Sequence, residues 1–104
     1  MNILLVCSAG MSTSMIVKKM QDEAKSQNIE AHIEASPEGQ VNSKLENLDV
    51  ILIGPQVRYL EKKLKKLTES TDIKVDIIDP KAYGMIQGDK ILQQAIDLKM
   101  SNKG

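Results

Sequence analysis

Residues 2–14 read NILLVCSAGMSTS, and this stretch decides the fold class. Its first six residues form a nearly continuous apolar run rich in leucine and β-branched residues, which predicts a strand buried on both faces. Small residues follow, and then Ser12, Thr13 or Ser14 can cap a helix. A buried strand that runs through a short loop into a helix is typical of α/β proteins with a parallel sheet.

The next two elements follow from their hydrophobic periodicity. A helix ending near residues 27–28 is predicted, because apolar residues recur at three- and four-residue spacing. Residues 29–35 then alternate, with odd positions apolar and even positions polar, which predicts a strand with one wet face at the edge of the sheet. The predicted buried stripe of the helix consists of Ile16, Val17, Met20 and Ala24.

The second half of the chain shows the same alternation of strand and helix. Residues 36–48 are expected to be mostly loop with a short helical turn, and residues 50–53 to be a second buried strand closed by Gly54 and Pro55. A helix over 57–68 and a strand over 74–78 follow. After a loop containing Tyr83, Gly84 and Gly88, a last helix is expected to bury Ile91, Leu92, Ala95, Ile96 and Met100.

This order predicts a three-layer α/β fold, in which a four-stranded parallel sheet has helices on both faces. Right-handed crossovers with the polar-faced strand at one edge give the strand order 2-1-3-4. The first and third strands are then central neighbours whose connections leave on opposite faces, so a crevice opens at their carboxyl ends. Cys7 and the segment at Gly54 and Pro55 flank that crevice.

Composition excludes several classes of function. With 104 residues the chain is expected to form one domain over residues 1–104, and its 14 basic and 14 acidic residues cancel, which argues against nucleic acid as a partner. No apolar run is long enough to cross a membrane, and no signal peptide is expected. A single cysteine fits a reducing cytoplasm. No His/Cys cluster or acidic pair indicates a metal, and no cofactor is predicted.

Cys7 is the candidate nucleophile. Backbone amides of the loop after it, and the positive end of the helix dipole, form a cradle for an anion. The same field stabilises a thiolate, so a nucleophile inside a phosphate-sized nest indicates a phosphocysteine. The alternative is a small buried cysteine followed by serines that merely cap the helix.

A hydrolase of the low-molecular-weight phosphatase type is the main competing hypothesis. Such enzymes carry a C-x-x-x-x-x-R loop whose arginine clamps phosphate oxygens, but the arginine position holds Thr13 here. Asp79 with Pro80 resembles a general-acid loop, although a strand-ending turn is the favoured interpretation. His32, flanked by glutamates on the wet face of the edge strand, is interpreted as a surface histidine. A redox-sensing thiol is a third hypothesis, but the chain has no second cysteine that could resolve an oxidised Cys7.

The sequence resembles the enzyme IIB components of the lactose/cellobiose (chitobiose) branch of the phosphoenolpyruvate-dependent sugar phosphotransferase system. The resemblance rests on residues 7–14 (CSAGMSTS), residues 49–59 (DVILIGPQVRY), Tyr83 with Gly84, and the closing helix. It implies a fold resembling that of the low-molecular-weight tyrosine phosphatases. It also implies a phosphohistidine–sugar phosphotransferase that works as a free-standing cytoplasmic phosphocarrier, reaching the inner face of the membrane only through its permease.

The resemblance also implies roles for residues. Cys7 would accept a phosphoryl group from a phosphohistidine of enzyme IIA and pass it to a disaccharide of cellobiose, chitobiose or lactose type bound by the IIC permease. The implied phosphate-binding loop comprises Ser8, Ala9, Gly10, Met11, Ser12, Thr13 and Ser14. For the rim that contacts these partners we predict Met11, Gln56, Tyr59 and Tyr83, and we expect a monomer.

Overall fold

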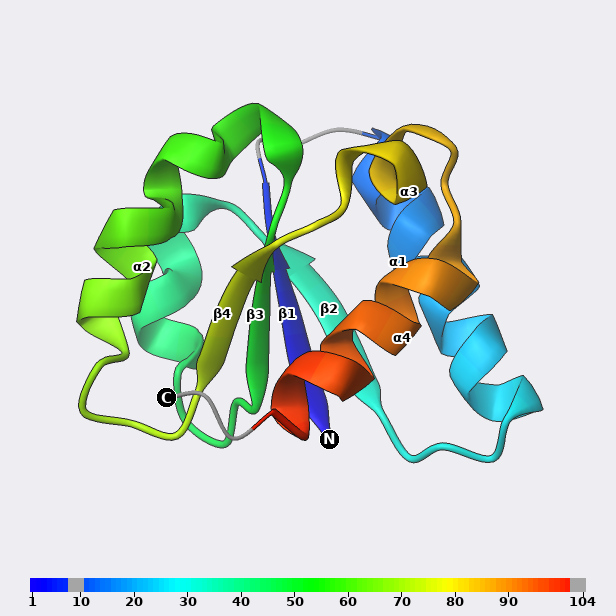
Figure 1. The fold of residues 1–104 in the computed structure, drawn as a ribbon, viewed down its shortest axis with the longest axis horizontal. Helices are drawn as coiled ribbons and strands as arrows, with labels where there is room; N and C mark the ends of the chain where they lie inside the picture. The colour runs from blue at the N-terminus through cyan, green and yellow to red at the C-terminus, as the bar shows by residue number, and fades with distance from the viewer. Residues whose placement is uncertain (8–10, 102–104) are drawn as a thin grey trace.

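A computed structural model describes residues 1–7 and 11–101 of the chain. Its sheet has four parallel strands in the order β2-β1-β3-β4, which confirms the predicted order. The strands are β1 (Asn2–Val6), β2 (His32–Ser36), β3 (Val50–Ile53) and β4 (Lys74–Ile77). All four arrows in Figure 1 point toward the end of the molecule where α3 and the start of α1 lie, so the carboxyl ends of the strands share one edge.

The two central strands divide the core into two halves, as a sheet covered on both faces requires. Successive side chains of a strand point to opposite faces. The alternate residues of β1 and β3 accordingly belong to two separate apolar clusters, and nearly all of them are fully buried. One cluster contains Ile3, Leu5, Val50 and Leu52, and the other contains Leu4, Val6, Ile51 and Ile53.

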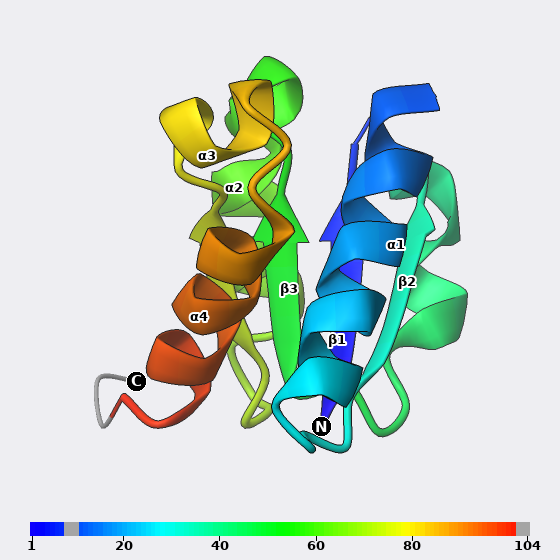
Figure 2. The same ribbon diagram turned by 90° about the vertical axis from the view of Figure 1, so that its right-hand side faces the viewer.

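Helices cover both faces, which confirms the three-layer prediction. On one face lie α1 (Met11–Ser26), α3 (Pro80–Gly84) and α4 (Gly88–Lys99). On the other lie the 3-10 helices η1 (Glu38–Lys44) and η2 (Pro55–Leu60) and the helix α2 (Glu61–Leu67). Figure 2 shows the face that carries α1, α3 and α4, with α1 running beside β1 and β2, and α4 beside β3.

The end of α1 is set by Asn28, inside the predicted stop at 27–28. Asn28 adopts the left-handed conformation with φ 57°. The amide of Ile29 donates to the carbonyl of Ala24 at 2.8 Å, and the amide of Asn28 donates to that of Lys25 at 3.1 Å. This pair of hydrogen bonds is the Schellman motif that closes a helix when the chain turns away.

Strand β2 is shorter than predicted. It begins at His32 rather than Ile29, because the register pairs His32 with Asn2 and residues 29–31 therefore lie beyond the start of β1. The prediction of an edge strand is confirmed. The strict alternation is wrong at its end, where Ala35 is exposed and Ser36 is buried.

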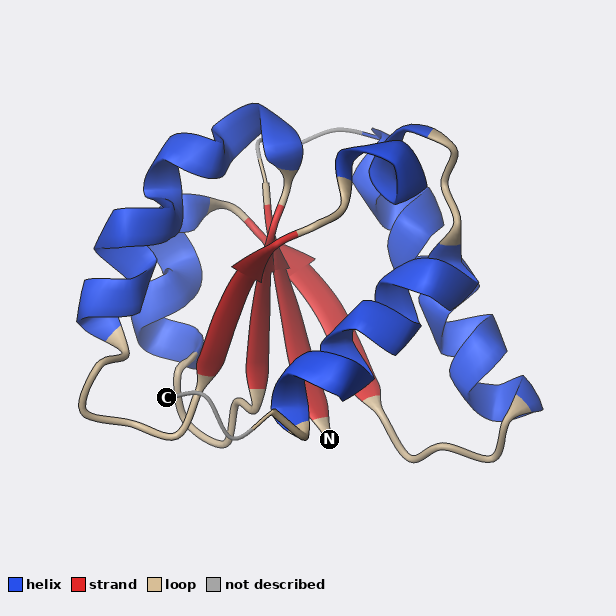
Figure 3. Cartoon of the chain, viewed as in Figure 1, coloured by secondary structure: helices blue, strands red, loops and turns tan. Residues whose placement is uncertain are grey.

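The helical segments differ from prediction in two places (Figure 3). The helix predicted over 57–68 begins earlier, because Pro55 occupies a first helical position after the extended Gly54, and it is a 3-10 helix up to Leu60. Tyr83 and Gly84, predicted in a loop, end the short helix α3, which Asp79 caps by accepting the amide of Lys81 at 3.2 Å.

The predicted buried stripe of α4 is confirmed except for its last residue. Ile91, Leu92 and Ala95 are buried and Ile96 packs against the same cluster. Met100 is 78% exposed, so its predicted burial is wrong. The helix ends at Lys99, and the residue after it no longer follows the 3.6-residue periodicity.

Candidate functional site

Cys7 lies directly after β1, where it meets the segment that follows β3. The amide of Gly54 donates to the carbonyl of Val6 at 2.8 Å. A Cβ built on Gly54 would lie 3.0 Å from the Cβ of Cys7 and 3.1 Å from Oε1 of Gln56, so only a glycine fits between them without a shift. The predicted proximity of Cys7 and the Gly54 segment, at the carboxyl ends of the two central strands, is therefore confirmed.

The thiol of Cys7 contacts the first turn of α1. Its Sγ lies 2.9 Å from Oγ1 of Thr13, and the two side chains are 6% and 4% exposed. Because Thr13 is the third residue of α1, this contact holds the sulfur at the amino-terminal end of a 16-residue helix. Unpaired amides and the helix dipole favour negative charge at that end, so the position suits a thiolate or a phosphoryl group.

Tyr83 lies beneath the site rather than on an exposed rim. Helix α3 brings its hydroxyl to within 3.4 Å of Oγ1 of Thr13, and the side chain is only 8% exposed. The prediction that Tyr83 contributes an exposed contact surface is therefore corrected. Seventy residues separate Tyr83 from Thr13, so no local pattern in the sequence could have predicted this contact.

Two other predicted rim residues, Gln56 and Tyr59, are exposed and lie on η2. Gln56 is exposed and Tyr59 is 74% exposed, while their neighbours Val57 and Leu60 face the core. Sequence reasoning missed two further exposed apolar side chains on elements at this end of the molecule. These are Met15 of α1 and Met85, next to α3, which are 50% and 61% exposed.

The structure does not describe every predicted loop residue. Ser8, Ala9 and Gly10 lie outside the described residues, and for Met11 and Ser12 only the helical backbone is described. Ser14 is an exposed residue of the first turn of α1. The loop prediction therefore rests on Cys7 and Thr13, which flank that segment in the folded chain.

The described hydrogen bonds of Asp79 are made to groups other than Cys7. The Asp79 carboxylate caps α3 by accepting the amide of Lys81, and its own amide donates to the Gln94 side chain at 3.1 Å. Asp79 with Pro80 therefore begins a short helix, where the sequence predicted a strand-ending turn. His32 is an exposed residue at the start of the edge strand β2.

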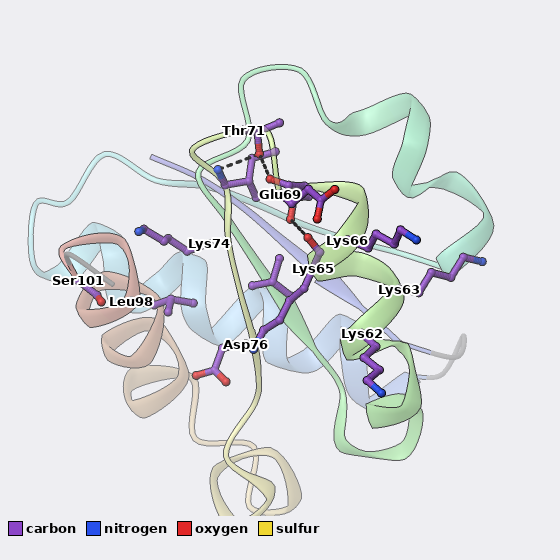
Figure 4. Close-up of a pocket in the computed structure, with 13 residues that line it drawn as sticks. Lys62, Lys63, Lys65, Lys66, Glu69, Thr71, Lys74, Asp76, Leu98 and Ser101 are labelled. Carbon is purple, nitrogen blue, oxygen red and sulfur yellow. Dashed lines mark hydrogen bonds between the residues drawn. The ribbon is translucent and has the colours of Figure 1, made fainter. Parts of the chain in front are cut away.

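A broad groove of about 970 Å³ lies far from Cys7, between α2, β4 and the end of α4. Lys62, Lys63 and Lys66 line one side of it, and Figure 4 shows their ammonium groups fanning outward instead of converging on one point. Such divergent lysines cover a solvated helix face and do not form an anion site.

Two classes of site are not found in the described part of the chain. No group of three or more metal-ligating side chains occurs within residues 1–7 and 11–101. No helix among these residues has the length and apolar character needed to cross a bilayer.

The chain is similar in sequence to known proteins over nearly its whole length. A sequence model of the family described as "PTS system, Lactose/Cellobiose specific IIB subunit" matches residues 2–94. The oligo-beta-mannoside-specific EIIB component of Bacillus subtilis is 41% identical, over 95% of this chain and 96% of that protein. The cellobiose-specific EIIB component of Lactococcus lactis is 37% identical, over 92% and 94% of the two chains.

Solved structures show the same fold. The cellobiose-specific IIB component of Borrelia burgdorferi has a TM-score of 0.78 and 46% identity, over 94% of this chain and 90% of that one. The lactose-specific IIB domain of Streptococcus pneumoniae has a TM-score of 0.84 with 17% identity, over 94% and 96%. These domains have the fold of the low-molecular-weight tyrosine phosphatases. The chain belongs to the lactose/cellobiose-specific IIB family of the sugar phosphotransferase system.

Proposed function

We propose that this protein is a phosphocarrier in which Cys7 is the phosphorylated residue. The contact that carries the proposal joins Sγ of Cys7 to Oγ1 of Thr13 at 2.9 Å, at the amino-terminal end of α1. A phosphoryl group on this sulfur lies in the field of the helix dipole, next to a hydroxyl that can donate to it. Membership of the IIB family supports the same role.

The first transfer loads the carrier. The thiolate of Cys7 attacks the phosphorus of a phosphohistidine on enzyme IIA, in line with the P–N bond. The S–P bond forms, the P–N bond breaks, and the imidazole leaves with its electron pair. The amides of residues 8–14 and the hydroxyls of Ser12, Thr13 and Ser14 hold the phosphoryl oxygens. Met11, Gln56 and Tyr59 contact the partners around this opening.

The second transfer unloads the carrier. A hydroxyl of the sugar held by the IIC permease attacks the phosphorus, the O–P bond forms, and Cys7 leaves as a thiolate while a base takes the hydroxyl proton. Relatives at 37% to 41% identity are named for oligo-β-mannosides, galactose and cellobiose. Because these names differ in the sugar, we place sugar selection in the permease, and we keep a disaccharide of cellobiose, chitobiose or lactose type as the proposed acceptor.

The proposal also covers the oligomeric state of the protein, its location and its need for a cofactor. The protein works as a monomer, as a single domain over residues 1–104, in the cytoplasm, and meets the inner face of the membrane only while docked to the permease. No cofactor takes part, since both transfers need only a nucleophile, a leaving group and hydrogen-bond donors. Hydrolysis is disfavoured because Thr13 replaces the clamping arginine and its hydroxyl contacts Sγ.

Intact-protein mass spectrometry tests the proposal. The protein is incubated with phosphoenolpyruvate and the upstream carriers, with and without the cognate IIA. A single phosphoryl adduct that requires IIA, maps to Cys7 and is discharged by permease and sugar is the expected result. Cys7→Ser should abolish this relay while the far-UV circular dichroism spectrum stays unchanged. A Cys7→Ser protein that still relays phosphate would refute the assignment, and turnover of an aryl phosphate by the wild type would favour a hydrolase.

A further inference from the structure

Three buried polar side chains form a row under the site. Sγ of Cys7 lies 2.9 Å from Oγ1 of Thr13, and this oxygen lies 3.4 Å from the hydroxyl of Tyr83. All three side chains are less than a tenth exposed. They come from three elements, namely the end of β1, the first turn of α1, and α3. A buried hydroxyl in such a row is costly unless its hydrogen bonds are made.

The direction of the hydrogen bonds follows from the number of protons available. A thiolate can only accept, so the single proton of the Thr13 hydroxyl must point at Sγ when Cys7 is ionised. The Thr13 oxygen is then free to accept, and the Tyr83 hydroxyl is placed to donate to it. In this arrangement the row has a thiolate at one end and, at the other, a phenol hydroxyl 3.4 Å from the Thr13 oxygen. A chain of aligned hydrogen bonds strengthens each of its members.

The backbone after α3 turns sharply at Ile86. Ile86 has φ 53°, in the left-handed region that a β-branched residue rarely adopts. The amide of Gln87 donates to the carbonyl of Ala82 at 2.9 Å, and the amide of Ile86 donates to that of Tyr83 at 3.2 Å. These two bonds form the Schellman motif that ends α3 after Gly84. Strain of this kind persists where the surrounding structure requires one arrangement.

We propose that Tyr83 is a positioning residue for the Cys7 thiolate and acts through the hydroxyl of Thr13. Its donation fixes the Thr13 proton toward sulfur, which holds the sulfur in one orientation. This inference extends the proposed phosphocarrier function, but its physical content concerns the thiolate alone. It can therefore be measured without any phosphoryl donor.

The test measures alkylation of Cys7 by iodoacetamide as a function of pH. Tyr83→Phe keeps the ring and removes the hydroxyl, and it should slow alkylation near neutral pH by about threefold to tenfold, the size expected for one hydrogen bond between two neutral hydroxyls. The midpoint of the pH–rate profile should move to higher pH. Thr13→Val should slow alkylation at least as much, and Thr13→Ser should restore a profile near that of the wild type.

Two further variants separate positioning from a general loss of structure. If Tyr83 acts through Thr13, adding Tyr83→Phe to Thr13→Val should cause no further slowing. Thr68→Val removes an equally buried hydroxyl, 3% exposed and bonded to the carbonyl of Leu64 in α2, and should leave the profile unchanged. An unchanged profile for Tyr83→Phe, or full additivity of the two effects in the double variant, overturns the proposal.

Phosphoryl uptake from phospho-IIA is measured on the same proteins, so the two proposals fail in different ways. A wild type that takes up no phosphoryl group, while its alkylation profile responds as described, refutes the carrier function and leaves the positioning role intact. Normal uptake by the wild type, together with an alkylation profile that Tyr83→Phe leaves unchanged, supports the carrier function and refutes the positioning role of Tyr83.

Discussion

Gly88 is where α4 approaches α1 most tightly, and Gly88→Ala is the sharpest test of the packing. A Cβ at this position would lie 2.6 Å from the Cβ of Lys19, 2.7 Å from its carbonyl carbon and 2.8 Å from the amide nitrogen of Met20. Carbon atoms in contact prefer about 3.5 to 4.0 Å. Two of the three neighbours are backbone atoms, so a change of rotamer cannot relieve the clash and the helices must separate.

The expected loss of stability follows from these distances. Overpacking a tight core contact costs about 1 to 3 kcal/mol, and separating α4 from α1 also loosens the apolar cluster that both helices share. The gain in helix propensity from glycine to alanine is at most about 1 kcal/mol and is smaller at the first residue of a helix. We therefore expect Gly88→Ala to lower the free energy of unfolding by about 2 kcal/mol, and the midpoint of thermal unfolding by about 10 °C.

Urea unfolding followed by far-UV circular dichroism measures this change. The matched control is Gly84→Ala, because a Cβ on Gly84 meets no atom within 4 Å. The control should stay within about 0.5 kcal/mol of the wild type, and both variants should keep its m-value. The packing argument is refuted if Gly88→Ala is as stable as Gly84→Ala.

Three further predictions concern the salt bridge at the amino end of the sheet, the core and the site. The hydrogen bond from Lys99 lowers the pKa of Asp49 below its ordinary 3.8, so this carboxylate stabilises the fold above that pH and the contribution disappears as pH falls through the lowered pKa. Asp49→Asn should therefore cost about 1 kcal/mol at pH 7 and progressively less below pH 4, as measured by urea unfolding across pH. Leu92→Ala, at a position 1% exposed, should cost about 2 to 5 kcal/mol in the same assay, whereas Met100→Ala, at a position 78% exposed, should change stability by less than about 0.5 kcal/mol. Gly54→Ala should displace the cysteine Cβ that lies 3.0 Å away and slow phosphoryl uptake by about tenfold, while costing about 1 kcal/mol or less of stability; uptake at the wild-type rate would contradict that reading.

The sequence could predict the helix boundaries only where the local signal was unambiguous. Asn28 ended α1 as expected because a left-handed asparagine with an apolar residue after it is a local stop signal. The cap of α3 was also present in the sequence, since Asp79 precedes a proline at the first helical position. The same dipeptide is common in turns, and a helix of five residues shows no periodicity that could decide between the two.

The sequence by itself determined the central strands, their order and the place of Cys7 at the carboxyl end of β1. Continuous burial and helical spacing are properties of neighbouring residues, and the handedness of crossovers then leaves few ways to arrange the strands. Only the tertiary structure decided that Tyr83 is buried against Thr13, that Gly88 touches the backbone of α1, and that Met100 is exposed. These facts depend on how distant elements pack, because contacts between residues far apart in the chain are fixed by the packing of whole helices and not by any local pattern.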